Sequence, residues 1–227
     1  MVDASPSVVV DARLCTGCGR CVKDCFPGVM HMENGSAVCR VSCMECGHCV
    51  AVCPEGAVRI EGSDMDGVEE FEASTFGVEP DHLLRSMKFR RSIRSFKDGP
   101  LGEDMLHALI EAGRYAPTAR NTQGTEFLVI QNEMPQLQEL LWRCMPAVVE
   151  SMAGDLPDYA RIFGGMVRRH EATGEDGLLL GAPAFVLVLT ENMWDGGLAA
   201  ANMEMMAAAC GAGVLHSGFM KRVIERS

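Results

Sequence analysis

The sequence has few aromatic residues and no long uninterrupted apolar run. Of its 227 residues, 6% are aromatic, with two Trp and two Tyr. The longest candidate for a membrane span, residues 196–214, is interrupted by Asn202 and Glu204, so we expect a buried helix there and no membrane partner. Residues 1–10 contain neither a basic region nor a sufficiently long apolar run for a secretory signal, so we expect no export.

Positive charge is also scarce. The chain has 20 Lys and Arg against 31 Asp and Glu, which gives a formal net charge of −11. This balance argues against a nucleic-acid partner, because such partners require a basic surface. Hydrophobic residues make up 48% of the chain, which is enough to form a core in one medium domain or in a small module joined to a larger one.

Cysteine, in contrast, is abundant and unevenly placed. Nine of the 11 cysteines lie in the first 53 residues, where "CTGCGRCVKDC" (15–25) and "CMECGHCVAVC" (43–53) repeat one spacing. A disulfide scaffold would require an oxidising compartment, and no export signal precedes these residues. The spacing is typical of metal ligands, so we expect reduced thiols and a cytoplasmic location.

The duplicated pattern resembles the bacterial-type ferredoxins with two [4Fe–4S] clusters, over residues 8–60. In these proteins the fourth cysteine of each run ligates the other cluster, so the resemblance implies two crossed ligand sets. The sets are Cys15, Cys18, Cys21 and Cys53 for cluster one, and Cys43, Cys46, Cys49 and Cys25 for cluster two. A pair of zinc sites is the alternative, although zinc modules usually have two C-x2-C pairs separated by a longer gap.

Two cysteines differ from the simple pattern. Cys25 is followed by Phe26 and then Pro27, so the local turn differs from that after Cys53, which Pro54 follows directly. Cys39 lies outside both runs, and we expect it to be a small buried thiol on a short strand that enters the second ligand loop.

The composition changes between residues 61 and 80. This stretch contains seven acidic residues and no Lys or Arg. We interpret it as an acidic linker, ordered only where Phe71 and Phe76 find a surface, between a domain at residues 1–60 and a second domain at residues 81–227. The alternative is that its charge steers a redox partner.

The second domain begins with a predicted helix, "EPDHLLRSMKF", that leads into "RRSIRSF" (90–96). Arg90, Arg91, Ser92 and Arg94 supply guanidinium groups and a hydroxyl, which suit a phosphate monoester. Taken alone, such a basic cluster is more often a solvated surface. An amphipathic helix (103–115), a loop with Pro117, and a strand (126–130) follow, and the loop amides match the polar edge of a flat heterocycle.

These segments together resemble the nitroreductase family of FMN enzymes, over about residues 85–220. The carrying motifs are "RRSIRSF", "APTARNTQG" with Thr118 for the usual Ser and Gly124 for the usual Pro, the buried strand expected in "GAPAFVLVLT", and "GGLAAANMEMMAAACGAGVLHSGF". The resemblance implies an α+β fold, with a ferredoxin-like domain preceding a mainly antiparallel sheet flanked by helices. Because the family's last strand and tail are missing, the resemblance also predicts either that the chain is truncated at its C-terminus or that its site is completed differently.

The resemblance also implies roles for individual residues. Arg90, Arg91, Ser92 and Arg94 would hold the FMN phosphate and ring edge, and Pro117, Thr118 and Asn121 would line the isoalloxazine. The turn at Leu215, His216, Ser217 and Gly218 would face the flavin, with a backbone N–H of Ser217 or Gly218 directed at N5. His216 has a second interpretation as a packed histidine. No catalytic side chain is predicted.

The helix at residues 197–210 has an apolar surface broken only by Asn202 and Glu204, so it needs cover on nearly all sides. The family resemblance implies that this cover comes from a homodimer. We expect an oxidoreductase that passes electrons from the clusters to FMN and on to a small oxidised acceptor, such as a nitro compound or quinone, with ferredoxin or NAD(P)H as donor. The alternative is an electron-transfer protein between partner proteins without a substrate of its own.

Overall fold

The computed structural model describes residues 7–226 and consists of two units. The first unit comprises the chain up to Gly77 together with the separate segment Thr118–Gln123. The second unit comprises Val78–Pro117 and the chain from Gly124 onward. The short loop at 118–123 therefore belongs with the N-terminal cysteine-rich unit, although the residues on both sides of it belong to the second unit.

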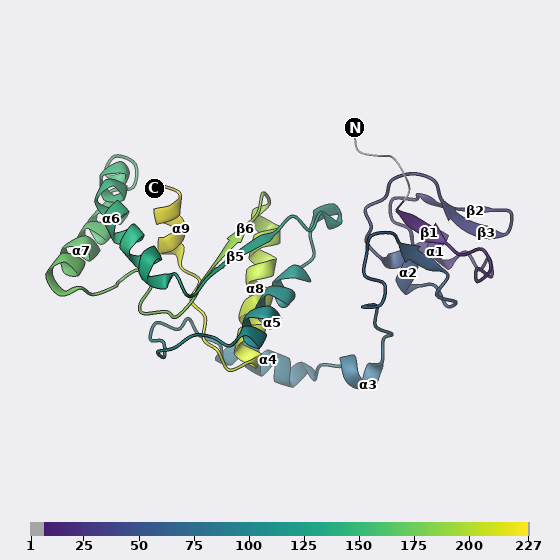
Figure 1. The fold of residues 1–227 in the computed structure, drawn as a ribbon, viewed down its shortest axis with the longest axis horizontal. Helices are drawn as coiled ribbons and strands as arrows, with labels where there is room; N and C mark the ends of the chain where they lie inside the picture. Colours follow the sequence, from purple (N-terminus) through teal and green to yellow (C-terminus); the bar gives the residue numbers. More distant parts are fainter. Residues whose placement is uncertain (1–6, 227) are drawn as a thin grey trace. The chain divides into compact units, whose positions relative to one another are not determined.

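The first unit contains two small antiparallel sheets and two short helices. Its elements are β1 (Val8–Val10), α1 (Arg20–Asp24), β2 (Met30–Glu33), β3 (Ser36–Cys39), α2 (His48–Ala51) and β4 (Val58–Ile60). Strand β1 pairs with β4, with Val8 opposite Ile60. Strand β2 pairs with β3 (Figure 1). The pairing of the first strand with the last closes the module, and a core of Val8, Met30, Ala37, Val58 and Ile60 forms beneath the cysteines.

The duplicated sequence produces duplicated backbone geometry. Gly19 and Gly47 each follow the second cysteine of a run and precede a short helix, with φ angles of 70° and 75°. Glycine adopts this left-handed region without steric cost. At Gly17, where φ is +69°, an added Cβ would lie 2.4 Å from the carbonyl oxygen of Gly35, so the first ligand loop can approach the β2–β3 turn only with glycine there.

The acidic linker is largely irregular, with one turn of helix, α3 (Ala73–Phe76). Phe71 and Phe76 pack on each other, with ring centroids 5.6 Å apart. Both rings are nevertheless exposed. Within the described chain they therefore pack on each other and not on a larger surface.

The first part of the second unit is a two-stranded sheet with a pair of helices packed against it. Its elements here are α4 (Pro80–Phe89), α5 (Glu103–Arg114), β5 (Glu126–Ile130), β6 (Phe185–Leu189) and α8 (Met193–Ala209). Strands β5 and β6 are antiparallel, and α5 and α8 lie side by side against them (Figure 1). The contact between α5 and β5 is so close that it requires glycine at position 113, because an added Cβ there would lie 2.7 Å from the ring of Phe127.

The remaining helices form a second core. These are α6 (Met134–Met152), α7 (Pro157–Thr173) and α9 (Gly218–Ile224). The 3-10 turn η1 (Ala119–Asn121), in the loop after α5, belongs to the first unit. Met145, Val148, Met152, Phe163 and Met220 are at most 2% exposed in this core. Trp142 of α6 stacks on His170 of α7, with ring centroids 3.9 Å apart.

The α+β class and the antiparallel pairing agree with the expectation from sequence. The strand at Glu126–Ile130 has the predicted bounds, and the helix expected at 103–115 ends at Arg114. Two expectations need correction. The strand β6 is half-buried, with Leu189 43% exposed, because only one of its faces meets α8. Helix α8 begins at Met193, four residues before the predicted start, because Asn192 caps it by accepting the N–H of Trp194. Within residues 7–226, no helix is both long and apolar enough to cross a membrane.

Candidate functional site

The eight predicted cluster ligands line two separate pockets of the first unit. One pocket is lined by Cys15, Cys18, Cys21 and Cys53. The other is lined by Cys25, Cys43, Cys46 and Cys49. The structure thus groups the fourth cysteine of each run with the three leading cysteines of the other run. All 11 cysteines of the chain are free thiols, so none of the eight is consumed by a disulfide.

Local hydrogen bonds and burial set the properties of these thiols. The N–H of Glu45 donates to Cys43 Sγ and that of Ala57 to Cys53 Sγ, both at 3.3 Å. Backbone N–H groups of Ala37 and Gly17 lower the pKa of Cys15, because they favour the thiolate. Burial raises the pKa of Cys49 to about 11, because the charged form loses solvation.

The donor set fits an iron–sulfur cluster. Four thiols converge on each pocket, backbone N–H groups point at sulfur, and the glycine-bounded loops leave room between the sulfurs. In residues 7–226 no group of three or more His, Cys, Asp or Glu stands close enough to hold a single metal ion. A cluster of four irons spans a wider gap between its thiolates than one ion does. Cys39 is buried and donates to the carbonyl of Val41, as expected for a packed thiol.

In the second unit, the arginine segment lies against the turn that precedes α9. Ile93 donates its backbone N–H to the carbonyl of Val214 at 3.0 Å. An added Cβ at Gly213 would lie 2.5 Å from Cγ1 of Ile93. This close packing brings Arg90–Arg94 and Leu215–Gly218 together, although more than 110 residues separate them in sequence.

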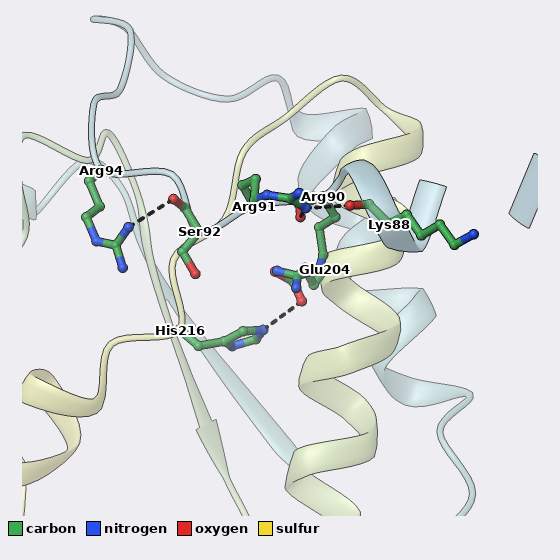
Figure 2. Close-up of polar contacts among 7 residues, drawn as sticks. All are labelled: Lys88, Arg90, Arg91, Ser92, Arg94, Glu204 and His216. Atoms are coloured by element: carbon green, nitrogen blue, oxygen red, sulfur yellow. Dashed lines mark hydrogen bonds and ion pairs between the residues drawn. The ribbon is translucent and has the colours of Figure 1, made fainter. Parts of the chain in front are cut away.

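Glu204 links these two segments electrostatically. Arg90 Nη1 donates to Glu204 Oε1 at 2.7 Å, and His216 Nε2 lies 3.3 Å from Glu204 Oε2 (Figure 2). The Glu204 side chain is 13% exposed, so its charge is balanced mainly by the guanidinium of Arg90. The sequence signal for this role is the single acidic residue within the apolar part of α8, which sequence reasoning treated only as an interruption.

The other arginines remain accessible. Arg91 Nη1 donates to the carbonyls of Lys88 and Arg90, and Arg94 Nη1 donates to the carbonyl of Ser92 at 3.5 Å (Figure 2). Arg91, Ser92 and Arg94 are exposed, so their remaining donors can bind an anion. Ser217 accepts the N–H of Met220 with its hydroxyl and caps α9, which holds the turn in place.

The third predicted flavin segment is divided between the units. Pro117 is exposed at the end of a stretch of the second unit, whereas Thr118 and Asn121 belong to the first. Thr118 Oγ1 accepts the backbone N–H of Gln123 at 3.0 Å and closes the loop. Asn121 Nδ2 donates to the carbonyls of Met44 and Glu45 in the second cysteine run. Their predicted contact with the isoalloxazine stays a prediction.

The fold and these groups define a cysteine-rich module joined to an α+β unit with an exposed arginine segment, and this chain was compared with known proteins. Residues 87–224 match the sequence model of the Nitroreductase family, and residues 14–58 match that of the 4Fe-4S dicluster domain. Because the first match covers more than half of the chain, this protein belongs to the nitroreductase family.

Individual relatives are similar over part of their length. An "NADPH-dependent oxidoreductase" of Staphylococcus aureus strain MRSA252 is 30% identical over 157 residues, which are 64% of this chain and 57% of the relative. A nitroreductase with bound FMN from Bacteroides fragilis has 26% identity and a TM-score of 0.44, over 57% of this chain and 65% of that chain. A BluB-like flavoprotein from Clostridium difficile has 22% identity and a TM-score of 0.47, over 60% and 73%. The chain thus spans less than two thirds of the length of the curated relative.

Proposed function

We propose that this protein is an iron–sulfur flavoprotein oxidoreductase that takes up electrons at two [4Fe–4S] clusters and passes them through FMN to a small oxidised acceptor. The observation that supports this most is that one chain contains two four-thiol pockets and an arginine segment held against a predicted flavin turn. The family membership and the FMN named in a related structure point the same way.

Different residues of the chain would bind the clusters and the FMN. Bound clusters would supply one-electron transfer and bound FMN would supply two-electron chemistry to the acceptor. The eight cysteines hold the clusters, and Arg91, Ser92 and Arg94 offer donors to the FMN phosphate. Glu204 contacts both Arg90 of the arginine segment and His216 of the turn, and so holds these two side chains in position.

The electron donor is either NADPH or a ferredoxin-type protein. The name of the Staphylococcus relatives supports NADPH, and the cysteine module supports one-electron input from a ferredoxin. The acceptor class we propose is a nitro compound or a quinone, because both accept electrons from an exposed flavin. The second candidate function is electron transfer between partner proteins with no substrate of its own, which the exposed cysteine Cys18 at the first pocket would allow.

Anaerobic purification followed by iron, sulfide and flavin analysis tests the proposal. We expect two four-iron clusters and one FMN per chain, and reduction by NADPH or by reduced ferredoxin. Acceleration of FMN reoxidation by nitroaromatics or quinones supports the enzyme, and its absence alongside rapid exchange with a protein acceptor supports the carrier. Zinc in place of iron contradicts the cluster assignment, and absence of flavin contradicts the FMN assignment.

We also propose a homodimer formed through α8. Trp194, Leu198 and Met193 are 80%, 45% and 75% exposed on this helix, and Ala201 continues the same face. A second copy of the chain would cover them, because homodimer interfaces are more apolar than the rest of the surface. Sedimentation of the wild type and of Leu198→Glu tests this, with a dimer expected for the first and a monomer for the second. A monomeric wild type contradicts it.

A further inference from the structure

The segment 118–123 makes one specific polar contact within the first unit. Asn121 Nδ2 donates to the carbonyl oxygen of Met44 and to that of Glu45, both at 3.1 Å. Met44 and Glu45 stand between Cys43 and Cys46, two of the predicted ligands of cluster two. One side-chain amide thus bridges two consecutive carbonyls of a ligand loop.

This contact requires a side chain with two N–H donors, which asparagine has. An amide group has two N–H donors on one nitrogen, so it can serve both carbonyls at once, whereas a carboxylate has none. Since both partners are carbonyl oxygens, the atom that faces them must be the nitrogen. Asn121 Oδ1 accepts from Gln123 Nε2 at 3.3 Å, which supports the same orientation.

The backbone on both sides of the contact is held in an unfavourable conformation. Glu45 has φ 49°, and Arg120, Asn121 and Gln123 have φ between 47° and 57°. Asparagine tolerates this region, but Glu, Arg and Gln avoid it, and such conformations persist only where surrounding contacts fix them. The two hydrogen bonds of Asn121 join the two strained segments, so each one holds the other.

We propose that Asn121 is a positioning residue for cluster two: its amide clamps the Met44–Glu45 peptides and couples segment 118–123 to cluster two and not to cluster one. The segment is continuous in the chain with α5 and β5, because it is entered from Pro117 and left through Gly124. The assignment of this loop to a cluster rests on the proposed function, whereas the two hydrogen bonds of Asn121 do not depend on it.

The test uses the anaerobically purified full chain, whose iron and flavin contents are measured first. Asn121→Asp keeps the size of the side chain and loses both donors, and Asn121→Ala removes the whole group. Thr122→Ala is the matched control, because Thr122 is exposed in the same segment and its φ of −68° suits alanine. The readouts are hydrogen–deuterium exchange of peptides covering residues 43–47 and 15–19, and a potentiometric titration of the two clusters.

We expect both Asn121 variants to raise exchange in residues 43–47 by about tenfold, as lost hydrogen bonds in a local opening would. Residues 15–19 should be unchanged, one of the two reduction potentials should shift, and Thr122→Ala should resemble the wild type. Unchanged exchange at 43–47, or equal changes at both loops, overturns the inference. Loss of FMN with an unaltered cluster-two loop also overturns it and assigns Asn121 to the flavin.

Failure of the proposed function gives a different result. If the wild type binds iron but no FMN, the flavin part of the proposed function is wrong, whereas the exchange result still decides whether Asn121 clamps the ligand loop. If the wild type binds both and the exchange is insensitive to Asn121, the proposed function stands and the clamp is wrong.

Discussion

Arg90 and Glu204 form a partly buried ion pair, with 2.7 Å between Arg90 Nη1 and Glu204 Oε1. Arg90 belongs to the segment predicted to bind the FMN phosphate, and Glu204 is the acidic residue within the apolar part of α8. The side chain of Arg90 is 35% exposed and that of Glu204 is 13% exposed, so solvent screens the pair incompletely. Glu204 orients Arg90, and it would compete for Arg90 with the phosphate of the predicted FMN. These two effects have opposite consequences for stability and for FMN affinity, and variants can separate them.

Glu204→Gln should lower stability and tighten FMN binding. Loss of the carboxylate charge weakens the bonds to Arg90 and His216, which should reduce the free energy of unfolding by about 1 kcal/mol. The same change removes a negative charge beside the phosphate, which should lower the Kd for FMN roughly fivefold. Chemical denaturation and fluorescence titration with FMN measure the two effects. The exposed Glu139→Gln on α6 is the control, and weaker FMN binding by Glu204→Gln would show that orientation dominates over competition.

Arg90→Ala should discriminate between FMN and riboflavin. A lost charge-assisted hydrogen bond to phosphate weakens FMN binding roughly ten- to hundredfold. Riboflavin lacks the phosphate, so its Kd should be unchanged, and parallel fluorescence titrations with both ligands measure this. Arg161→Ala removes an exposed arginine of α7 that pairs with Asp158, and it should alter neither affinity. Equal losses for both ligands would place Arg90 at the ring and not at the phosphate.

Gly213→Ala should disturb the arginine segment from a distance. Its Cβ would stand 2.5 Å from Cγ1 and 3.0 Å from Cβ of Ile93, so Ile93 must shift. Overpacking of this kind costs about 1–3 kcal/mol of stability, and displacement of the adjacent Ser92 and Arg94 should weaken FMN binding. Thermal unfolding and FMN titration check both effects. Gly102→Ala is the control, because its Cβ would meet nothing within 4 Å and its φ of −65° suits alanine.

Paired cysteine variants should reveal the crossed ligand sets. Replacing Cys15 and Cys53 together by Ala should remove the cluster of one pocket and leave about half of the iron. Replacing Cys25 and Cys53 together should damage both pockets and remove nearly all of the iron. Iron analysis after anaerobic purification distinguishes the two, and Cys39→Ala should retain full iron. Equal iron in both double variants would contradict the crossing.

Much of the local structure could be predicted because it depends on short-range patterns. The bounds of β5 and nearly those of α5 follow from apolar periodicity and from the turn residues that flank them. The start of α8 was missed because the cap at Asn192 carries no apolar signal. The limited burial of β6 was missed because the number of faces that a strand buries depends on its neighbours in space.

The candidate site divides in the same way. The amino-acid sequence by itself determined which side chains could serve as ligands, because cysteine spacing, loop glycines and clustered guanidinium groups act over a few residues. Only the tertiary structure decided that Glu204 would meet Arg90 across 114 positions, and that Asn121 would hold the loop at Met44 across 77. The reason is that such pairs form only when packing of the helices and ligand loops brings remote backbone together, and no local pattern encodes that proximity.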